Sequence, residues 1–97
     1  VAFGMGGVYT EVLKDITFRV APIGKDEALK MIKEIKMYPL LRGVRGEAPS
    51  DTEALAEMIS QFSLLPFFYP DIHEADLNPV FLYEKGACAA DVRILGK

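Results

Sequence analysis

The sequence predicts a small α+β domain in which two helices pack on one face of a largely antiparallel sheet. Segments near both ends of the chain alternate apolar and polar residues at the two-residue period of strands, and the middle carries two apolar repeats at helical spacing. The predicted order is β-β-α-α-β-β. Because strands gather at the ends and helices in the middle, an antiparallel sheet is favoured over a parallel βαβ arrangement.

The composition is that of an ordinary globular domain, and we expect one domain over residues 1–97. Hydrophobic residues make up 51% and charged residues 26% of the chain. The net charge of -3 and the lack of a long Lys/Arg run argue against a nucleic-acid partner. No apolar stretch approaches the roughly 18 residues that span a bilayer, so no membrane association is expected. A single cysteine is consistent with a cytoplasmic protein.

The first hairpin is expected from two short β-rich runs, 8–13 and 16–20, which are joined by a tight turn at Lys14 and Asp15. The chain opens with an apolar segment and without Met, which leads us to expect a fragment of a longer protein.

Two amphipathic helices are predicted next. The first covers 26–37, with acidic residues early and lysines late, as the helix dipole favours. A loop is expected over 38–49. The second helix starts at a capping box, Ser50-Asp51-Thr52-Glu53, and Pro66 is expected to end it. The residues expected to face the core are Ala28, Met31, Ile32, Ile35, Leu55, Met58, Ile59, Phe62 and Leu65.

The last part of the chain predicts a second hairpin with Lys85 and Gly86 at its turn. That turn places Val80 opposite Asp91 and makes Asn78 a diagonal neighbour of Asp91. By alternation, one face carries Glu74, Asp76, Asn78 and Asp91. The other, apolar face is expected to carry Ala75, Leu77, Phe81, Tyr83, Cys88, Ala90, Val92 and Ile94.

Carboxylate and amide oxygens that converge on one sheet face suit a hard divalent cation, Mg²⁺ or Mn²⁺, that also binds phosphates. The alternative is that an acidic, solvated face only keeps an antiparallel sheet soluble. Spacing alone leaves both readings open.

Four blocks resemble, in order, the C-terminal ATP-grasp segment of ADP-forming (NDP-forming) acyl-CoA synthetases, whose beta subunit or domain is related to that of succinyl-CoA synthetase. They are F-G-M-G-G-V-Y-T-E-V-L-K-D-I-T-F-R-V-A-P at 3–22, Y-P-L-L-R-G-V-R-G-E-A-P at 38–49, E-A-D-L-N-P-V at 74–80 and A-A-D-V-R-I at 89–94. The resemblance implies half of an ATP-grasp fold that binds ATP or ADP with magnesium. It also implies that Asn78 and Asp91 hold the metal.

The resemblance implies further roles and partners. Asp76 would be a third metal ligand or a catalytic residue that faces the phosphohistidine. Arg45, and as a second candidate Arg42, would contact phosphate or an interface. Both arginines could equally cap carbonyls or form surface pairs. We expect His73 to be a surface residue and Cys88 to be a buried, inert thiol.

The implied reaction joins an acid and CoA at the expense of ATP, through a phosphohistidine on another domain. The partners are therefore the rest of the ATP-grasp domain and a CoA-binding, phosphohistidine-bearing subunit or domain, in an oligomeric assembly; the 97 residues alone are expected to be inactive. The alternative is a non-catalytic scaffold that binds a partner through the aromatic patch 67–69.

Overall fold

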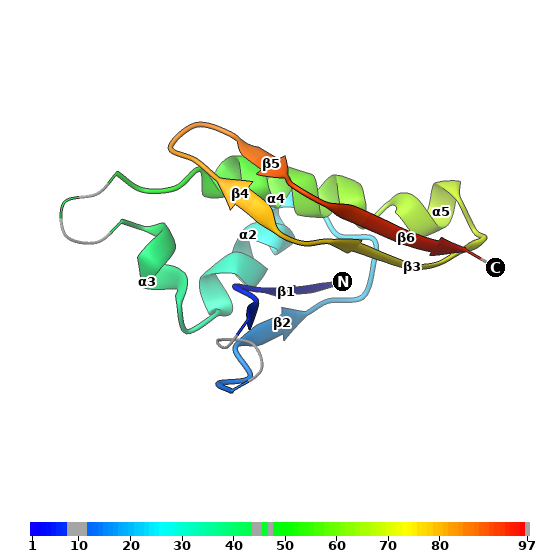
Figure 1. Cartoon of the computed structure of the whole chain (residues 1–97), viewed down its shortest axis with the longest axis horizontal. Helices are drawn as coiled ribbons and strands as arrows, with labels where there is room; N and C mark the ends of the chain where they lie inside the picture. The colour runs from blue at the N-terminus through cyan, green and yellow to red at the C-terminus, as the bar shows by residue number, and fades with distance from the viewer. Residues whose placement is uncertain (8–11, 44–45, 47, 97) are drawn as a thin grey trace.

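The computed structural model describes residues 1–7, 12–43, 46 and 48–96, with His73 described through its backbone only. Its centre is a pair of helices, α2 (Lys25–Glu34) and α4 (Thr52–Phe62), which lie against each other. Figure 1 shows them between the N-terminal strands and a long C-terminal hairpin. Ala28, Met31 and Ile32 are 0% exposed, so the predicted apolar stripe of the first helix is confirmed.

The core also takes in Ile23, Ile35, Leu41, Leu55, Ala56 and Ile59. Met58, Phe62 and Leu65, which were predicted to lie on the apolar face of the second helix, are only partly buried. Two short helices flank the pair, α3 (Tyr38–Leu41) inside the predicted loop and α5 (Leu65–Phe68) after α4. Within the described residues, no helix has the length and apolar content needed to cross a membrane.

The structure corrects both ends predicted for the second helix. Asp51, not Ser50, is the N-cap, because its carboxylate accepts a hydrogen bond from the Ala54 N–H at 3.0 Å. The helix ends at Phe62, and Pro66 lies in the first turn of α5, where a missing N–H costs nothing.

The strands are antiparallel, as predicted, and they pair as three two-stranded units. In the first, β1 (Ala2–Gly4) pairs with β2 (Ile16–Phe18). The partner of β2 is therefore β1 and not the predicted strand over 8–13, of which residues 8–11 lie outside the described residues and 12–13 form a turn. Residues 38–41 and 65–68 also differ from the predicted element order, because short helices occupy them.

Asp15, predicted only as a turn residue, is buried at 3% exposure. Its two carboxylate oxygens accept the N–H groups of Lys36 and Met37, at 2.5 and 2.9 Å. These donors stand between the end of α2 and the start of α3, where helical backbone leaves N–H groups unpaired. Asp15 therefore ties the first hairpin to the helical layer.

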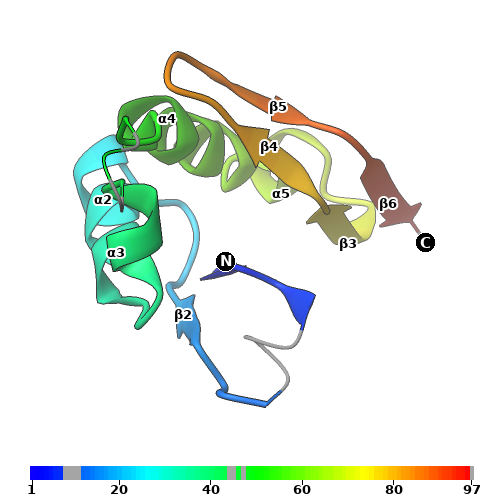
Figure 2. The ribbon, with the colours of Figure 1, turned by 60° about the vertical axis from the view of Figure 1, so that its left-hand side comes forward.

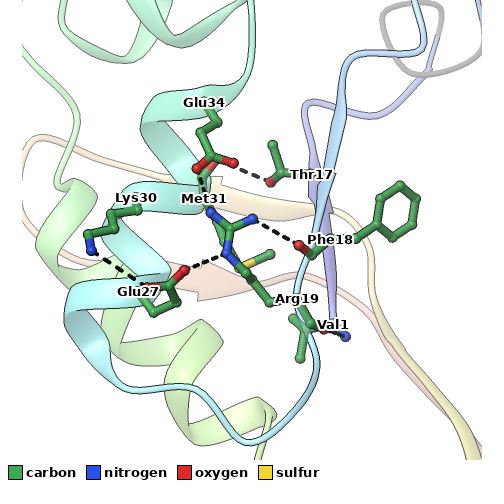
Figure 3. A network of polar contacts seen from close by, with 8 residues as sticks. All are labelled: Val1, Thr17, Phe18, Arg19, Glu27, Lys30, Met31 and Glu34. Carbon is green, nitrogen blue, oxygen red and sulfur yellow. Dashed lines mark hydrogen bonds and ion pairs between the residues drawn. The ribbon is translucent and has the colours of Figure 1, made fainter.

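Arg19 makes a second link between the first hairpin and α2 (Figure 3). Its Nε donates to Glu27 at 2.6 Å and its Nη2 to Glu34 at 2.5 Å, so one guanidinium bridges two turns of the helix. The hydroxyl of Thr17 adds a hydrogen bond to the Met31 carbonyl at 3.1 Å. Hydrogen bonding from Arg19 holds the pKa of Glu27 below its ordinary value.

Replacing Arg19 with methionine should lower the thermal midpoint at pH 7, and the loss should shrink at high salt because the ion pairs are partly exposed. A carboxyl with a depressed pKa stabilises the fold above its unfolded-state pKa, and that contribution is lost as pH falls through the folded-state value. The difference between variant and wild type should therefore fade below about pH 4. Lys33→Met, an exposed change on the same helix, is the control; equal midpoints for the two variants at pH 7 would contradict this role.

The C-terminal hairpin is one continuous antiparallel ribbon with a central interruption (Figure 2). Its outer part pairs β3 (Ile72–Leu77) with β6 (Val92–Gly96), and its inner part pairs β4 (Val80–Leu82) with β5 (Ala87–Ala89). Val80 faces Ala89, so the predicted pairing of Val80 with Asp91 is wrong by two residues. The reason is the turn: Tyr83 and Gly86 close it, which puts Glu84 and Lys85 at its centre.

The interruption also changes which side chains face the core. Val80 and Leu82 pack against it, whereas Phe81, Tyr83 and Cys88 are exposed, contrary to the prediction. Ala90, Val92 and Ile94, which were also expected on the core face, are exposed as well. The strand breaks at Asn78 and Pro79, whose peptide bond is cis, and the two-residue alternation restarts one position later. Simple alternation through this break therefore assigned the inner part of the ribbon to the wrong face.

Candidate metal centre

Asn78 and Asp91 lie directly across the ribbon from each other, at its interruption. The Asn78 N–H donates to the Asp91 carbonyl at 3.2 Å, and the neighbouring Ala90 N–H donates to the Pro79 carbonyl at 2.9 Å. The prediction that these two residues come together is confirmed, although they are opposite and not diagonal neighbours. Both are exposed.

The next cross-strand pair outward on the same face is Asp76 with Arg93. Each stands two residues from the first pair along its strand, a rise of about 7 Å. Asp76, Glu74 and Arg93 border a cavity of about 230 Å³ on this face. One face of the ribbon thus carries two carboxylates, an amide and a guanidinium in two adjacent rows.

The side chains of these four residues make no hydrogen bond or ion pair with any other residue that the structure describes. Their donors and acceptors are therefore available to a ligand. The described residues contain no group of three or more His, Cys, Asp and Glu side chains placed to hold a metal ion. Two carboxylates and an amide instead fit a cation such as Mg²⁺, which keeps waters and takes further oxygens from phosphates.

A groove of about 840 Å³ adjoins this face and runs between the first hairpin, α4 and the ribbon. Asp76 and Asn78 border it at one side, and apolar side chains such as Phe3, Met58 and Phe62 border the rest. A mostly apolar hollow with a few polar groups at one edge is the usual form of a small-molecule site.

The remaining predicted residues are less informative. Arg45 lies outside the described residues, and so does the side chain of His73; Arg42 is exposed. Phe67, Phe68 and Tyr69 are 60%, 71% and 61% exposed, so the aromatic patch 67–69 is available in this structure.

Two residues of this region were missed at the level of sequence. Arg93 stands two positions after Asp91, and the same alternation that groups the carboxylates would have placed it on their face. Asp51 was predicted only as part of a capping box, yet its Oδ2 also accepts the Gly86 N–H at 2.7 Å. No local pattern indicates that contact, since 35 residues separate the partners.

The structure thus combines an antiparallel ribbon, two helices beneath it and an oxygen-rich face beside an apolar groove. Residues 1–95 match the ATP-grasp domain family, and the chain belongs to that family. It is 53% identical over 95 residues to the beta subunit of ADP-forming acetate–CoA ligase I of Pyrococcus furiosus, covering 98% of this chain and 41% of that subunit. It is 51% identical over 96 residues to ADP-forming 4-hydroxybutyrate–CoA ligase of Nitrosopumilus maritimus, covering 97% of this chain and 14% of that protein.

Solved structures of related enzymes have the same fold as this chain. The dinucleotide-forming acetyl-coenzyme A synthetase 1 of Ca. Korarchaeum cryptofilum, in its apo form, superposes with a TM-score of 0.92 at 43% identity, covering 99% of this chain and 46% of that one. The same enzyme in complex with coenzyme A and Mg-AMPPCP, its phosphohistidine segment pointing towards the nucleotide site, gives a TM-score of 0.91 at 43% identity, covering 99% of this chain and 45% of that one. The chain thus spans less than half the length of each of these proteins.

Proposed function

We propose that this chain is the part of an ADP-forming acyl-CoA synthetase that holds the divalent cation of the nucleotide, with Asn78 and Asp91 as its ligands. The observation that carries the proposal is the direct cross-strand placement of these two residues, whose side chains have no partner among the described residues. The family membership and the Mg-AMPPCP complex of the related synthetase support it.

In this proposal the ribbon face supplies oxygens from three residues: the amide of Asn78 and the carboxylates of Asp91 and Asp76. When bound, Mg²⁺ neutralises charge that develops on the phosphates during phosphoryl transfer. Asp76, one row further out, completes the ligand set or orients the group that accepts the phosphoryl. Mn²⁺ prefers the same oxygen ligands and should substitute.

Arg93 gives this face its positive charge, because it stands opposite Asp76 and pairs with no described carboxylate. A guanidinium matches the geometry of phosphate oxygens and stays charged at all working pH values. We assign Arg93 to an anionic group of the nucleotide or of the transferred phosphoryl. Arg45, the earlier candidate for this contact, stays a prediction.

The overall reaction joins an acid to CoA with conversion of ATP to ADP and phosphate, through a phosphohistidine on another domain or subunit. The adenine pocket and the second wall of the cleft belong to the rest of the ATP-grasp unit, and residues 1–97 form one part of it. That the complete enzyme is oligomeric and cytoplasmic stays a prediction.

Calorimetric titration of the intact protein with ADP tests this function. ADP should bind in the presence of Mg²⁺ or Mn²⁺ and lose most of its affinity when the cation is chelated. In the Asn78→Ala, Asp91→Ala double variant, binding should be weak and insensitive to the cation. Arg93→Gln should keep the cation dependence but bind ADP about 10-fold more weakly, as for loss of a charged hydrogen bond. A double variant that binds ADP in the normal cation-dependent way would rule the site out.

A non-catalytic role remains a second candidate because Phe67, Phe68 and Tyr69 are exposed together. A contiguous aromatic surface of this kind is typical of protein interfaces. In the intact protein, Phe67→Ser with Phe68→Ser should disrupt assembly with a partner subunit while leaving nucleotide binding unchanged. Normal assembly in that variant would remove the reason for this reading.

A further inference from the structure

Asp51 links the turn of the C-terminal ribbon to the start of α4 through three hydrogen bonds. Its own N–H donates to the Tyr83 carbonyl at 2.8 Å, and its Oδ2 accepts the Gly86 N–H at 2.7 Å. Its Oδ1 accepts the Ala54 N–H at 3.0 Å and so caps the helix. One residue therefore contacts both ends of the turn and the helix beneath it.

These bonds replace part of the usual closure of a hairpin. In the last pair of the ribbon, the Tyr83 N–H donates to the Gly86 carbonyl at 3.1 Å. The complementary groups of that pair, the Tyr83 carbonyl and the Gly86 N–H, bond to Asp51. Gly86 has a φ of +91°, a conformation that glycine adopts without strain. Asp51 thus helps to determine which two residues close the turn.

The pair that closes the turn fixes the register of the whole ribbon. From Tyr83 and Gly86 the pairing runs without a shift through Val80 with Ala89, past the interruption, to Leu77 with Val92. Asn78 and Asp91 belong to this series. A slip of one residue at the turn would move one of them to the opposite face of the ribbon.

Two kinds of contact oppose a slip of the ribbon. Val80 and Leu82 pack against the core, and a shift of one residue would turn them away from it. The hydrogen bonds of Asp51 are directional, and they start from a helix whose Leu55 and Ala56 are buried in the core. The Gly86 and Ala54 N–H groups hold the pKa of Asp51 below its ordinary value, so the carboxylate stays charged at neutral pH.

We propose that Asp51 is a positioning residue for the metal centre: by bonding to both ends of the turn, it sets the ribbon register that brings Asn78 and Asp91 together. This role rests on the proposed function of that pair. Asp51 acts through the backbone of the ribbon and does not contact the nucleotide or the metal.

The test is the Mg²⁺ dependence of acyl-CoA synthesis by the intact enzyme carrying Asp51→Ser. A serine hydroxyl still caps α4, but it is too short to reach Gly86 as well. We expect the Mg²⁺ concentration for half-maximal rate to rise about 10-fold or more, within the range seen when residues behind metal ligands are lost. Saturating Mg²⁺ should recover most of kcat, and the thermal midpoint should stay near that of wild type. The control is Glu53→Gln. Glu53 lies in the first turn of α4, next to Asp51, and the change removes its surface ion pair with Lys25 of α2.

Asp51→Asn gives a second measurement, because an amide keeps the shape of the side chain and can accept at only one of its two polar atoms. It should shift the Mg²⁺ requirement in the same direction. An unchanged Mg²⁺ requirement in both variants overturns the proposal, even if the thermal midpoint falls. The proposed function is tested separately, by Asp91→Ala. If that variant had a normal Mg²⁺ requirement, the proposed metal site would be wrong, whatever the result for Asp51→Ser.

Discussion

Replacing Asp91 with alanine is expected to lower the rate of ADP-forming acyl-CoA synthesis by about 10²-fold or more, the usual scale for loss of one preorganised charged group. Asp91 is exposed, its side chain contacts no described residue, and it stands opposite Asn78. The fold should therefore tolerate the change while the metal centre does not. Steady-state rates at several Mg²⁺ concentrations in the intact enzyme would measure the loss.

Asp71→Ala is the matched control, because Asp71 is an exposed carboxylate just before the same ribbon but outside the metal-binding rows. It should leave the rate and the Mg²⁺ requirement unchanged. Equal activity in the Asp91 and Asp71 variants would contradict the metal site and would indicate that the acidic face only keeps the sheet soluble.

Replacing Ile32 with alanine should lower the free energy of unfolding by about 2–5 kcal/mol, because deletion of a fully buried side chain leaves a cavity between the helices. Ile32 is 0% exposed and sits in the core that joins α2 to α4. A drop of this size is a large part of the stability of a small domain. Denaturant unfolding of the intact protein, followed by hydrogen exchange in α2, would locate the loss.

Two further variants calibrate the effect. Ile32→Val removes one methylene and should cost about 0.5–1.5 kcal/mol. Val20→Ala changes a side chain that is 90% exposed and should stay within about 0.5 kcal/mol of wild type. A loss for Ile32→Ala no greater than that for Val20→Ala would show that the helix pair is not the stabilising core.

The helices were predictable because their signal is local. Apolar residues at helical spacing follow the acidic start of α2, and the structure buries Ala28, Met31 and Ile32 within the helix and Ile35 just after its end. The juxtaposition of Asn78 and Asp91 was also within reach, since any short turn near Gly86 brings their segments together. The resemblance in the four blocks then supplied the chemistry, which spacing alone left open.

The parts that sequence missed depend on contacts between distant residues. Asp15 resembles an ordinary turn residue, but it is buried because the N–H groups of Lys36 and Met37 meet it there. The ribbon register escaped prediction because Tyr83 and Gly86 close the turn, and two of their backbone groups bond to Asp51, far away in sequence. The inner face was assigned wrongly because alternation restarts after Pro79, and hydrophobicity alone does not mark such a restart.

Cys88, the single cysteine of the chain, is exposed three residues before Asp91 on the strand segment that leads to the metal centre. The inverted inner face of the ribbon turns this thiol outward, away from the packing of Val80 and Leu82. A fluorophore or spin label attached there would lie outside the core, on the strand segment that leads to Asp91. The ribbon thus carries an attachment point for an optical or magnetic reporter close to the proposed metal site, and Cys88 is the single cysteine among these 97 residues.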